Sequence, residues 1–144
     1  MAFRVDPHSD VPPSRQIVEA FLDRVANGSL PAGGCLPSIR ALAAAALVNP
    51  NTVGKAYRDL EALGVVEGRN GSGVFVTPAG AEIARGQRRR ATLDAFRRAA
   101  REALRAGHGE EALDAALMAL MRPAVSGRRG NGNGNGNGNG TEGA

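Results

Sequence analysis

The stretch VNPNTVGKAYRDLE, residues 48–61, constrains the fold more than any other part of this chain. Asn49 is among the best residues for capping a helix N-terminus, and Pro50 suits the first helical position because its missing N–H would lack a partner there anyway. Gly64 then follows as a helix terminator. The pattern predicts a helix from about Pro50 to Leu63, with an apolar stripe made of Val53, Ala56, Tyr57, Leu60 and Leu63.

A shorter helix is predicted just before it, because Ser38 is a good N-cap and apolar residues recur behind it at helical spacing. Only two or three residues separate these helices, so they must cross steeply to bury both stripes, which is the helix-turn-helix arrangement. Upstream, SRQIVEAFLDRVANG predicts a further helix over about Ser14 to Asn27. The stripes of these two helices are Ile39, Leu42, Ala43 and Ala46, and Ile17, Val18, Phe21, Leu22 and Val25.

Beyond Gly64 the period of the pattern changes. The segments VVE and VFV enclose GRNGSG, which predicts two short strands joined by a glycine-rich loop. Such a loop can instead cradle a phosphate, but that use needs a helix after the loop, and here the strand Val74 to Val76 follows. Three helices and a hairpin predict a winged helix-turn-helix, in a fold that is mainly α (α+β) with a two-helix C-terminal extension.

Size and composition limit what surrounds this domain. With 144 residues, 42% of them hydrophobic and only 3% aromatic, the chain allows one compact domain and an extension. We expect an N-terminal arm at 1–11, the winged domain at 12–77, a helical segment at 78–122 and a flexible Gly/Asn-rich tail at 123–144. The N-terminus has no apolar leader-like run and Cys35 is alone, so we expect a soluble, cytoplasmic protein.

The run LPSIRALAAAALVNPNTVGKAYRDLEALGVVEGRNGSGVFV resembles the DNA-binding domain of the GntR family of bacterial transcription regulators. The likeness spans about Pro12 to Val76 and includes the family's LPS-x-R-x-LA start, V-N-P-N-T-V-type recognition helix and R-x-GSG-x-FV wing. Two positions depart from it: Leu47 stands where the family usually has a glycine in the turn, and Cys35 stands where a polar residue is common. The resemblance implies a nucleoid-associated protein that binds double-stranded DNA.

The C-terminal half predicts a dimer. Thr77 and Pro78 are expected to start a long Arg-rich helix that ends near GHG at 107–109, and a shorter helix follows it. Two amphipathic helices cannot cover each other's stripes as an isolated pair, so we expect a homodimer, although the stripes can also pack back onto the winged domain. The stripe residues assigned to dimerisation are Leu93, Phe96, Ala100, Leu104, Leu113, Leu117 and Leu120.

Within the GntR family, a two-helix tail of this length resembles the YtrA-like members. These lack a large effector-binding domain and dimerise through the short helical segment. The resemblance implies a repressor of its own operon and of neighbouring transporter genes, acting on a two-fold symmetric operator. Whether an effector ligand exists is left open by the sequence.

Asn51, Thr52 and Lys55 lie opposite the apolar stripe at the start of the recognition helix, so they are the candidates for reading base edges. Gly54 between them would let the backbone approach DNA, and the Tyr57 hydroxyl could reach a phosphate. First-turn capping and a solvated helix face are the alternative roles. The complete set of candidate DNA-binding residues is Ser38, Arg40, Asn49, Asn51, Thr52, Lys55, Arg58, Arg69, Asn70, Gly71 and Ser72.

Charge is unevenly distributed: residues 1–77 carry seven basic and seven acidic side chains, so the net charge of +4 arises in the C-terminal half. Arg88, Arg89 and Arg90 are therefore candidates for flanking phosphate contacts, with a solvated face as the alternative. We expect no metal, since His8 and His108 lack metal-site spacing. We also expect no catalytic residues and no cofactor. Two other functions stay open: a sequence-tolerant chromosome-organising protein, and a MocR-like regulator without its aminotransferase domain.

Overall fold

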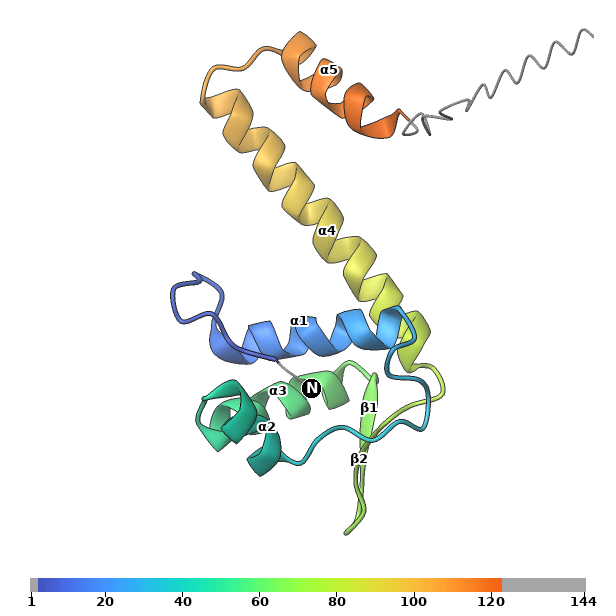
Figure 1. The fold of residues 1–144 in the computed structure, drawn as a ribbon. Helices are drawn as coiled ribbons and strands as arrows, with labels where there is room; N and C mark the ends of the chain where they lie inside the picture. The colour runs from blue at the N-terminus through green and yellow to red at the C-terminus, as the bar shows by residue number, and fades with distance from the viewer. Residues whose placement is uncertain (1–2, 123–144) are drawn as a thin grey trace, which may run out of the picture. The chain divides into compact units, whose positions relative to one another are not determined.

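A computed structural model describes residues 3–122 of the chain (Figure 1). It divides into two compact units, Met1–Arg101 and Glu102–Ala144. The first unit holds α1 (Pro13–Ala26), α2 (Ile39–Ala46), α3 (Pro50–Ala62), β1 (Val66–Arg69), β2 (Gly73–Val76) and most of α4 (Gly80–Arg105). The second holds the end of α4 and α5 (Glu110–Met121). The predicted winged helix-turn-helix is confirmed, while the Gly/Asn-rich tail lies outside the described residues.

The core of the first unit lies where α1 and α2 pack against α3 (Figure 1). The apolar stripes predicted for these helices supply most of it, and Val65, Val66 and Val76 close it from the hairpin side. The rings of Phe21 and Tyr57 meet edge to face with centroids 5.8 Å apart. That geometry suits the ring quadrupoles and fixes α1 across α3.

The turn between α2 and α3 combines a favourable cap with an unfavourable residue. The Asn49 side chain accepts a hydrogen bond from the Asn51 N–H at 2.8 Å, and Pro50 occupies the first helical position as predicted. Leu47 ends α2 with a left-handed φ of 55°, the one positive φ of a non-glycine residue between residues 3 and 122. Its side chain is 76% exposed, so burial contributes little toward offsetting the backbone strain.

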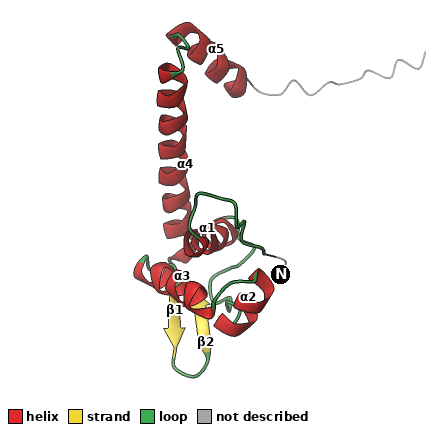
Figure 2. Ribbon diagram, turned by 90° about the vertical axis from the view of Figure 1, so that its left-hand side faces the viewer, coloured by secondary structure: helices red, strands yellow, loops and turns green. Residues whose placement is uncertain are grey.

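Strands β1 and β2 form the predicted antiparallel hairpin, with Val66 opposite Val76 and Arg69 opposite Gly73 (Figure 2). The link 33–36 between α1 and α2 lies along the other edge of β2. Cys35 forms an isolated bridge with Phe75, and the Leu36 N–H donates to the Val74 carbonyl at 2.9 Å. β2 is therefore paired on both of its edges, with β1 on one side and the link 33–36 on the other.

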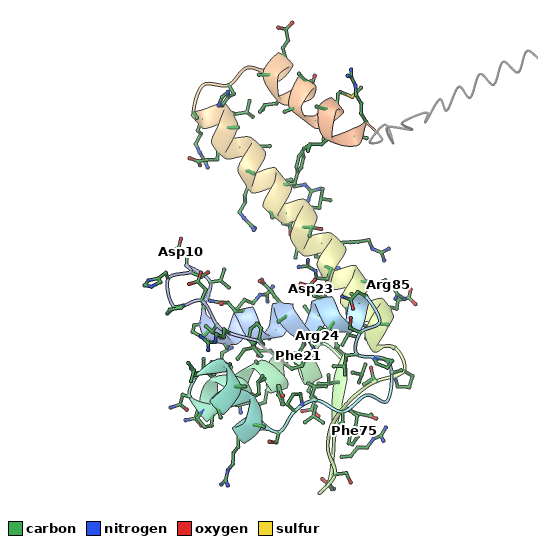
Figure 3. The ribbon with its side chains drawn as sticks, viewed as in Figure 1. Asp10, Phe21, Asp23, Arg24, Phe75 and Arg85 are labelled. Carbon is green, nitrogen blue, oxygen red and sulfur yellow. The ribbon has the colours of Figure 1, made fainter. Side chains whose placement is uncertain are left out.

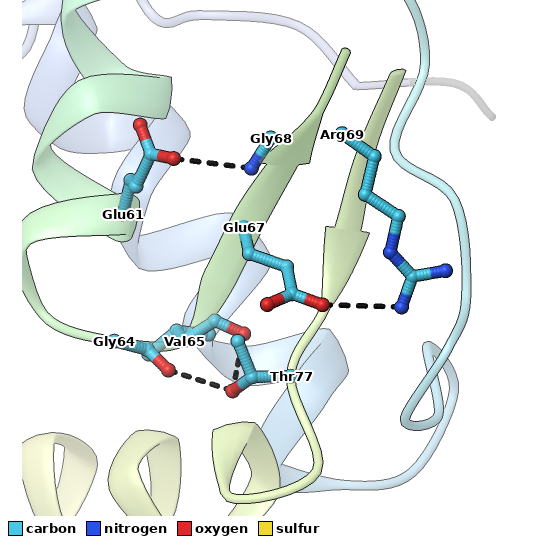
Figure 4. Close-up of polar contacts among 7 residues, drawn as sticks. All are labelled: Glu61, Gly64, Val65, Glu67, Gly68, Arg69 and Thr77. Atoms are coloured by element: carbon cyan, nitrogen blue, oxygen red, sulfur yellow. Dashed lines mark hydrogen bonds and ion pairs between the residues drawn. The ribbon is translucent and has the colours of Figure 1, made fainter. Parts of the chain in front are cut away.

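The predicted start of the fourth helix at Thr77 and Pro78 is wrong, because α4 begins at Gly80. The Thr77 hydroxyl does not cap a helix but donates to the Gly64 carbonyl at 2.7 Å, which joins the end of the hairpin to the end of α3 (Figure 4). Gly80 then passes the hairpin so closely that a Cβ there would lie 2.7 Å from the Val65 carbonyl oxygen. Only a residue without a side chain fits that crossing.

The second unit exposes its large apolar side chains. Within α5, Leu117 is 37% exposed and Leu120 is 81% exposed, and Leu113 is half-buried. Leu104, at the end of α4, is 49% exposed. None of the helices formed by residues 3–122 is long and apolar enough to span a bilayer.

Candidate nucleic-acid interface

The recognition helix α3 has one buried and one exposed face, as its sequence pattern predicts. Asn51, Lys55 and Arg58 are exposed and Thr52 is half-buried, whereas Val53 and Leu60 have no accessible surface. The exposed residues start at the helix N-terminus, where the backbone N–H groups also point outward. This face therefore combines hydrogen-bond donors with positive charge.

Lys55 and Arg58 differ in their surroundings. The Lys55 ammonium pairs with the Asp59 carboxylate at 3.0 Å, one turn further along the same face. For Arg58, no ion pair is present among residues 3–122. Its guanidinium lies over Gly54, 3.5 Å from the place where a Cβ would stand. Gly54 is consequently buried under Arg58 and Ile39, so the predicted close approach of the backbone to DNA at this residue requires Arg58 to move aside.

A groove of about 420 Å³ runs from the N-terminus of α2 to the wing. Its lining includes Ser38 and Arg40 from the start of α2 and Ser72 and Gly73 from the wing. The Ser38 hydroxyl caps α2 by accepting from the Ala41 N–H at 3.1 Å, and Arg40 is exposed. An anion in this groove would meet a guanidinium, a hydroxyl and the positive end of the α2 dipole.

The wing presents a polar tip next to a braced strand end. Arg69 closes β1 with its guanidinium 4.7 Å from the centre of the Phe75 ring and 3.1 Å from a Glu67 carboxylate oxygen (Figure 4). The side chains of Asn70 and Ser72 are exposed on the turn that follows, in which Gly71 adopts a φ of +72°. Arg69 thus lies at the outer end of β1, with its side chain against Phe75 and Glu67, and residues 70–72 form the tip of the wing.

The suggestion that the Tyr57 hydroxyl reaches a phosphate is wrong. The hydroxyl donates to the Pro37 carbonyl at 2.7 Å, and the residue is only 5% exposed. Burial, and to a lesser degree the neighbouring Cys35, raises the pKa of the Tyr57 hydroxyl far above its ordinary value, so this group stays neutral. Its role is to hold the start of α2, and with it Ser38 and Arg40, against α3.

Glu61 was missed by the sequence patterns. Its carboxylate accepts a hydrogen bond from the Gly68 N–H at 3.0 Å, and this bond connects the exposed end of α3 to β1 (Figure 4). The two residues are seven positions apart across a helix end and a strand, so no helical or strand period links them. The contact is one of those that hold the wing against the recognition helix.

The arginine cluster of α4 lies apart from this surface. Arg88 pairs with Asp23 near the C-terminal end of α1, and Arg85 lines the same depression. Figure 3 shows Asp23 and Arg85 together there, and Phe75 at a distance in the hairpin. Arg89 and Arg90 are exposed. Among residues 3–122 there is no cluster of three or more His, Cys, Asp or Glu able to hold a metal ion.

Comparison with known proteins agrees with this geometry. The family of bacterial regulatory proteins described as "gntR family" matches residues 13–76. The repressor YtrA of Bacillus subtilis is 38% identical over 74 residues, which are 51% of this chain and 57% of that protein. Across three curated relatives the matched part is only 50–61% of their length.

Solved structures extend the likeness beyond the winged domain. A transcriptional regulator from Oenococcus oeni aligns with a TM-score of 0.66 and 28% identity over 82% of this chain and 98% of that one. YtrA from Sulfolobus acidocaldarius, described as a GntR-family transcription factor, aligns with a TM-score of 0.52 and 31% identity over 67% of this chain and 98% of its own. The match to the family profile and to these regulators shows that the chain belongs to the GntR family of transcription regulators.

Proposed function

We propose that this protein is a dimeric, sequence-specific DNA-binding repressor of the YtrA-like type that acts on the nucleoid, in the cytoplasm, at a two-fold symmetric operator upstream of its own operon. One observation carries the proposal. The N-terminal half of α3, the start of α2 and the tip of the wing bring polar and basic side chains to adjoining surfaces, and the groove beside Arg40 reaches from α2 to the wing.

The chemistry of α3 suits readout in the major groove. There the amide of Asn51 can pair with adenine, the ammonium of Lys55 with guanine and the methyl group of Thr52 with thymine. Lys55 must exchange its Asp59 partner for a base, and this is feasible because the ion pair is exposed and weak. Asn49 keeps its side-chain oxygen in the helix cap, so only its amide N–H₂ is free to contact DNA.

The surrounding elements suit contacts with the DNA backbone. Arg40 and Ser38 would bind a phosphate at the start of α2, and Arg58 a phosphate beside the recognition helix. Asn70, Gly71 and Ser72 would lie along the sugar-phosphate backbone or in the minor groove. Arg69 would support them from the adjoining end of β1, since its guanidinium already contacts Phe75 and Glu67.

Dimerisation is supported by the apolar surface of α4 and α5. Leu93 and Phe96 are each 49% exposed, which argues against the alternative that they pack onto the winged domain of their own chain. A second copy would cover them, together with Ala100, Leu104, Leu113, Leu117 and Leu120. A two-fold dimer places its recognition helices on half-sites about one helical turn, or a multiple of it, apart.

Selection from random duplexes, followed by footprinting upstream of the gene itself, tests the proposal. Wild-type protein should enrich a two-fold symmetric sequence that also occurs in that upstream region. Replacing Asn51, Thr52 and Lys55 together by Ala should remove most of the preference for this sequence over random DNA. Arg90→Ala, which removes one exposed positive charge from α4, serves as the matched control and should keep the preference.

Two outcomes would count against sequence-specific repression. Equal affinity of the wild type for selected and random duplexes would indicate the sequence-tolerant, chromosome-organising alternative. A folded triple-alanine variant that retains the wild-type preference would show that α3 does not read the site. Deleting the gene should raise transcription of its own operon, measured from a promoter fusion, if the protein is an autorepressor.

A further inference from the structure

The base of α4 is held to the winged unit by two kinds of contact that differ in chemistry. The first is apolar: Gly80 and Ala84 are the buried residues of this helix, and Ala81 and Ile83 pack against the same core. The second lies one turn further along, where the Arg88 guanidinium pairs with the Asp23 carboxylate at 2.5 Å. From Leu93 onward the large apolar side chains of α4 are exposed.

Two contacts are needed because a helix held at a single point can tilt about it. Gly86 lies between the two contacts, and no atom stands within 4 Å of the position of a Cβ there. Packing therefore does not require this glycine, which lowers the stability of the helix where it leaves the domain. The Asp23–Arg88 ion pair lies beyond Gly86, where it opposes tilting.

A small tilt has a large effect at the far end of the first unit. Arg101 lies 17 residues beyond Ala84. With a rise of about 1.5 Å per residue, the distance between them is about 25 Å, and a rotation of about 10° moves one end by about 4 Å. Neighbouring base pairs are separated by roughly 3.4 Å along the duplex. A dimer that joins through α4 therefore shifts its reading position by about one base pair for a tilt of that size.

We propose that Asp23 and Arg88 are positioning residues that set the half-site spacing accepted by the dimer. They do so by fixing the angle at which α4 leaves the DNA-binding unit. The inference rests on the proposed function, since it needs a dimer on a two-part operator. It assigns no DNA contact to either residue. A partly exposed ion pair on the surface contributes little to folding, so its loss should change the geometry of binding more than the stability of the protein.

The test compares the affinity of the protein for versions of one operator that differ only in the length of the spacer between the half-sites. Wild-type protein selects its operator from random duplexes, and affinities are then measured for that duplex and for versions with the central spacer one base pair longer or shorter. Asp23→Asn, which keeps the shape of the side chain, should lower the affinity ratio between the selected and altered spacers by roughly three- to fivefold. Asp23→Glu, which retains the ion pair, should keep the wild-type ratio.

Further variants separate positioning from other effects. Arg88→Gln should behave like Asp23→Asn, although Arg85 also lines the depression at Asp23 and can partly replace Arg88. Arg90→Gln removes the same charge without touching the pair and should keep the wild-type ratio. General loss of structure would weaken binding to all spacers alike, and thermal unfolding of each variant measures it directly.

Distinct results separate failure of this inference from failure of the proposed function. If the wild type selects a two-part operator and Asp23→Asn keeps its spacing ratio, the positioning role is wrong while the regulator stands. If the wild type selects no two-part operator, the proposed function fails and the positioning role fails with it.

Discussion

The Tyr57 hydroxyl donates to the Pro37 carbonyl oxygen at 2.7 Å and so ties α3 to the residue before the α2 cap. This bond exists only while the hydroxyl is protonated, and burial raises its pKa above the ordinary value of 10.0. The unfolded chain loses the proton near that ordinary value, whereas the folded protein keeps it. The stabilisation is therefore complete below the unfolded pKa and is lost as pH rises above it.

The free energy of unfolding should accordingly fall as pH increases beyond 10.0, the unfolded pKa of this group. Tyr57 is the single tyrosine and the chain has no tryptophan, so the near-ultraviolet absorbance of tyrosinate reports this residue alone. Folded protein should titrate at higher pH than protein in denaturant. Tyr57→Phe should remove the tyrosine part of the pH dependence and cost about 1 kcal/mol at neutral pH. Identical titrations of folded and denatured protein would contradict the burial of this hydroxyl.

Leu47→Gly should stabilise the protein. Leu47 adopts a φ of 55°, which glycine accepts without strain, and its exposed side chain loses little burial when removed. The expected gain in the free energy of unfolding is about 1 kcal/mol, measured by urea denaturation. Ala44→Gly provides the control, because Ala44 is an exposed residue inside α2 where glycine should destabilise. A loss of stability in Leu47→Gly would mean that the leucine side chain, not the backbone, determines this turn.

Replacing either of two glycines of α4 by alanine should change the free energy of unfolding in opposite directions. At Gly80 a Cβ would lie 2.7 Å from the Val65 carbonyl oxygen and 2.9 Å from a Val76 methyl carbon, so Gly80→Ala should destabilise by about 1–3 kcal/mol. At Gly86 the space is open, so Gly86→Ala should stabilise by up to about 1 kcal/mol through helix propensity. Thermal unfolding of both variants checks the pair. Equal effects would show that α4 does not cross the hairpin as closely as described.

The sequence patterns predicted the helices of the winged domain because burial there follows the helical period. Val53 and Leu60 have no accessible surface, and the Asn49 cap depends only on residues adjacent in the chain. At these positions the local helix signals and the burial of side chains favour the same helix.

Prediction failed where contacts between distant segments overrule local signals. Thr77 followed by proline has the pattern of a helix start, yet its hydroxyl binds the Gly64 carbonyl, and the helix begins later. Glu61 and Asp23 resemble ordinary surface acids in the sequence, and only the fold brings them to Gly68 and Arg88. Such contacts have no sequence period, so they could not be predicted from spacing.

Gly54→Ala should separate the stability of α3 from its contact with DNA. A Cβ at this position would meet Arg58 at 3.5 Å and Ile39 at 3.9 Å, both ordinary contact distances. The variant should gain up to about 1 kcal/mol in the free energy of unfolding from helix propensity. Because Arg58 already covers Gly54, affinity for the selected operator should stay within about twofold, given that only ordinary contacts are added. A large loss of affinity with intact folding would mean that Arg58 moves aside and DNA reaches the backbone of α3.

Phe96→Asp should convert the dimer into a monomer. Phe96 is 49% exposed on the apolar stripe of α4, and a carboxylate there would have to be buried in the dimer contact. At roughly 100° per residue, Ala95 lies on the opposite side of the helix from that stripe, and it is exposed. Ala95→Asp therefore introduces the same charge outside the contact and should remain dimeric. Sedimentation equilibrium distinguishes the two states, and operator affinity should fall only for Phe96→Asp, because a monomer engages one half-site at a time. A dimeric Phe96→Asp variant with wild-type affinity would place the dimer contact elsewhere on the chain.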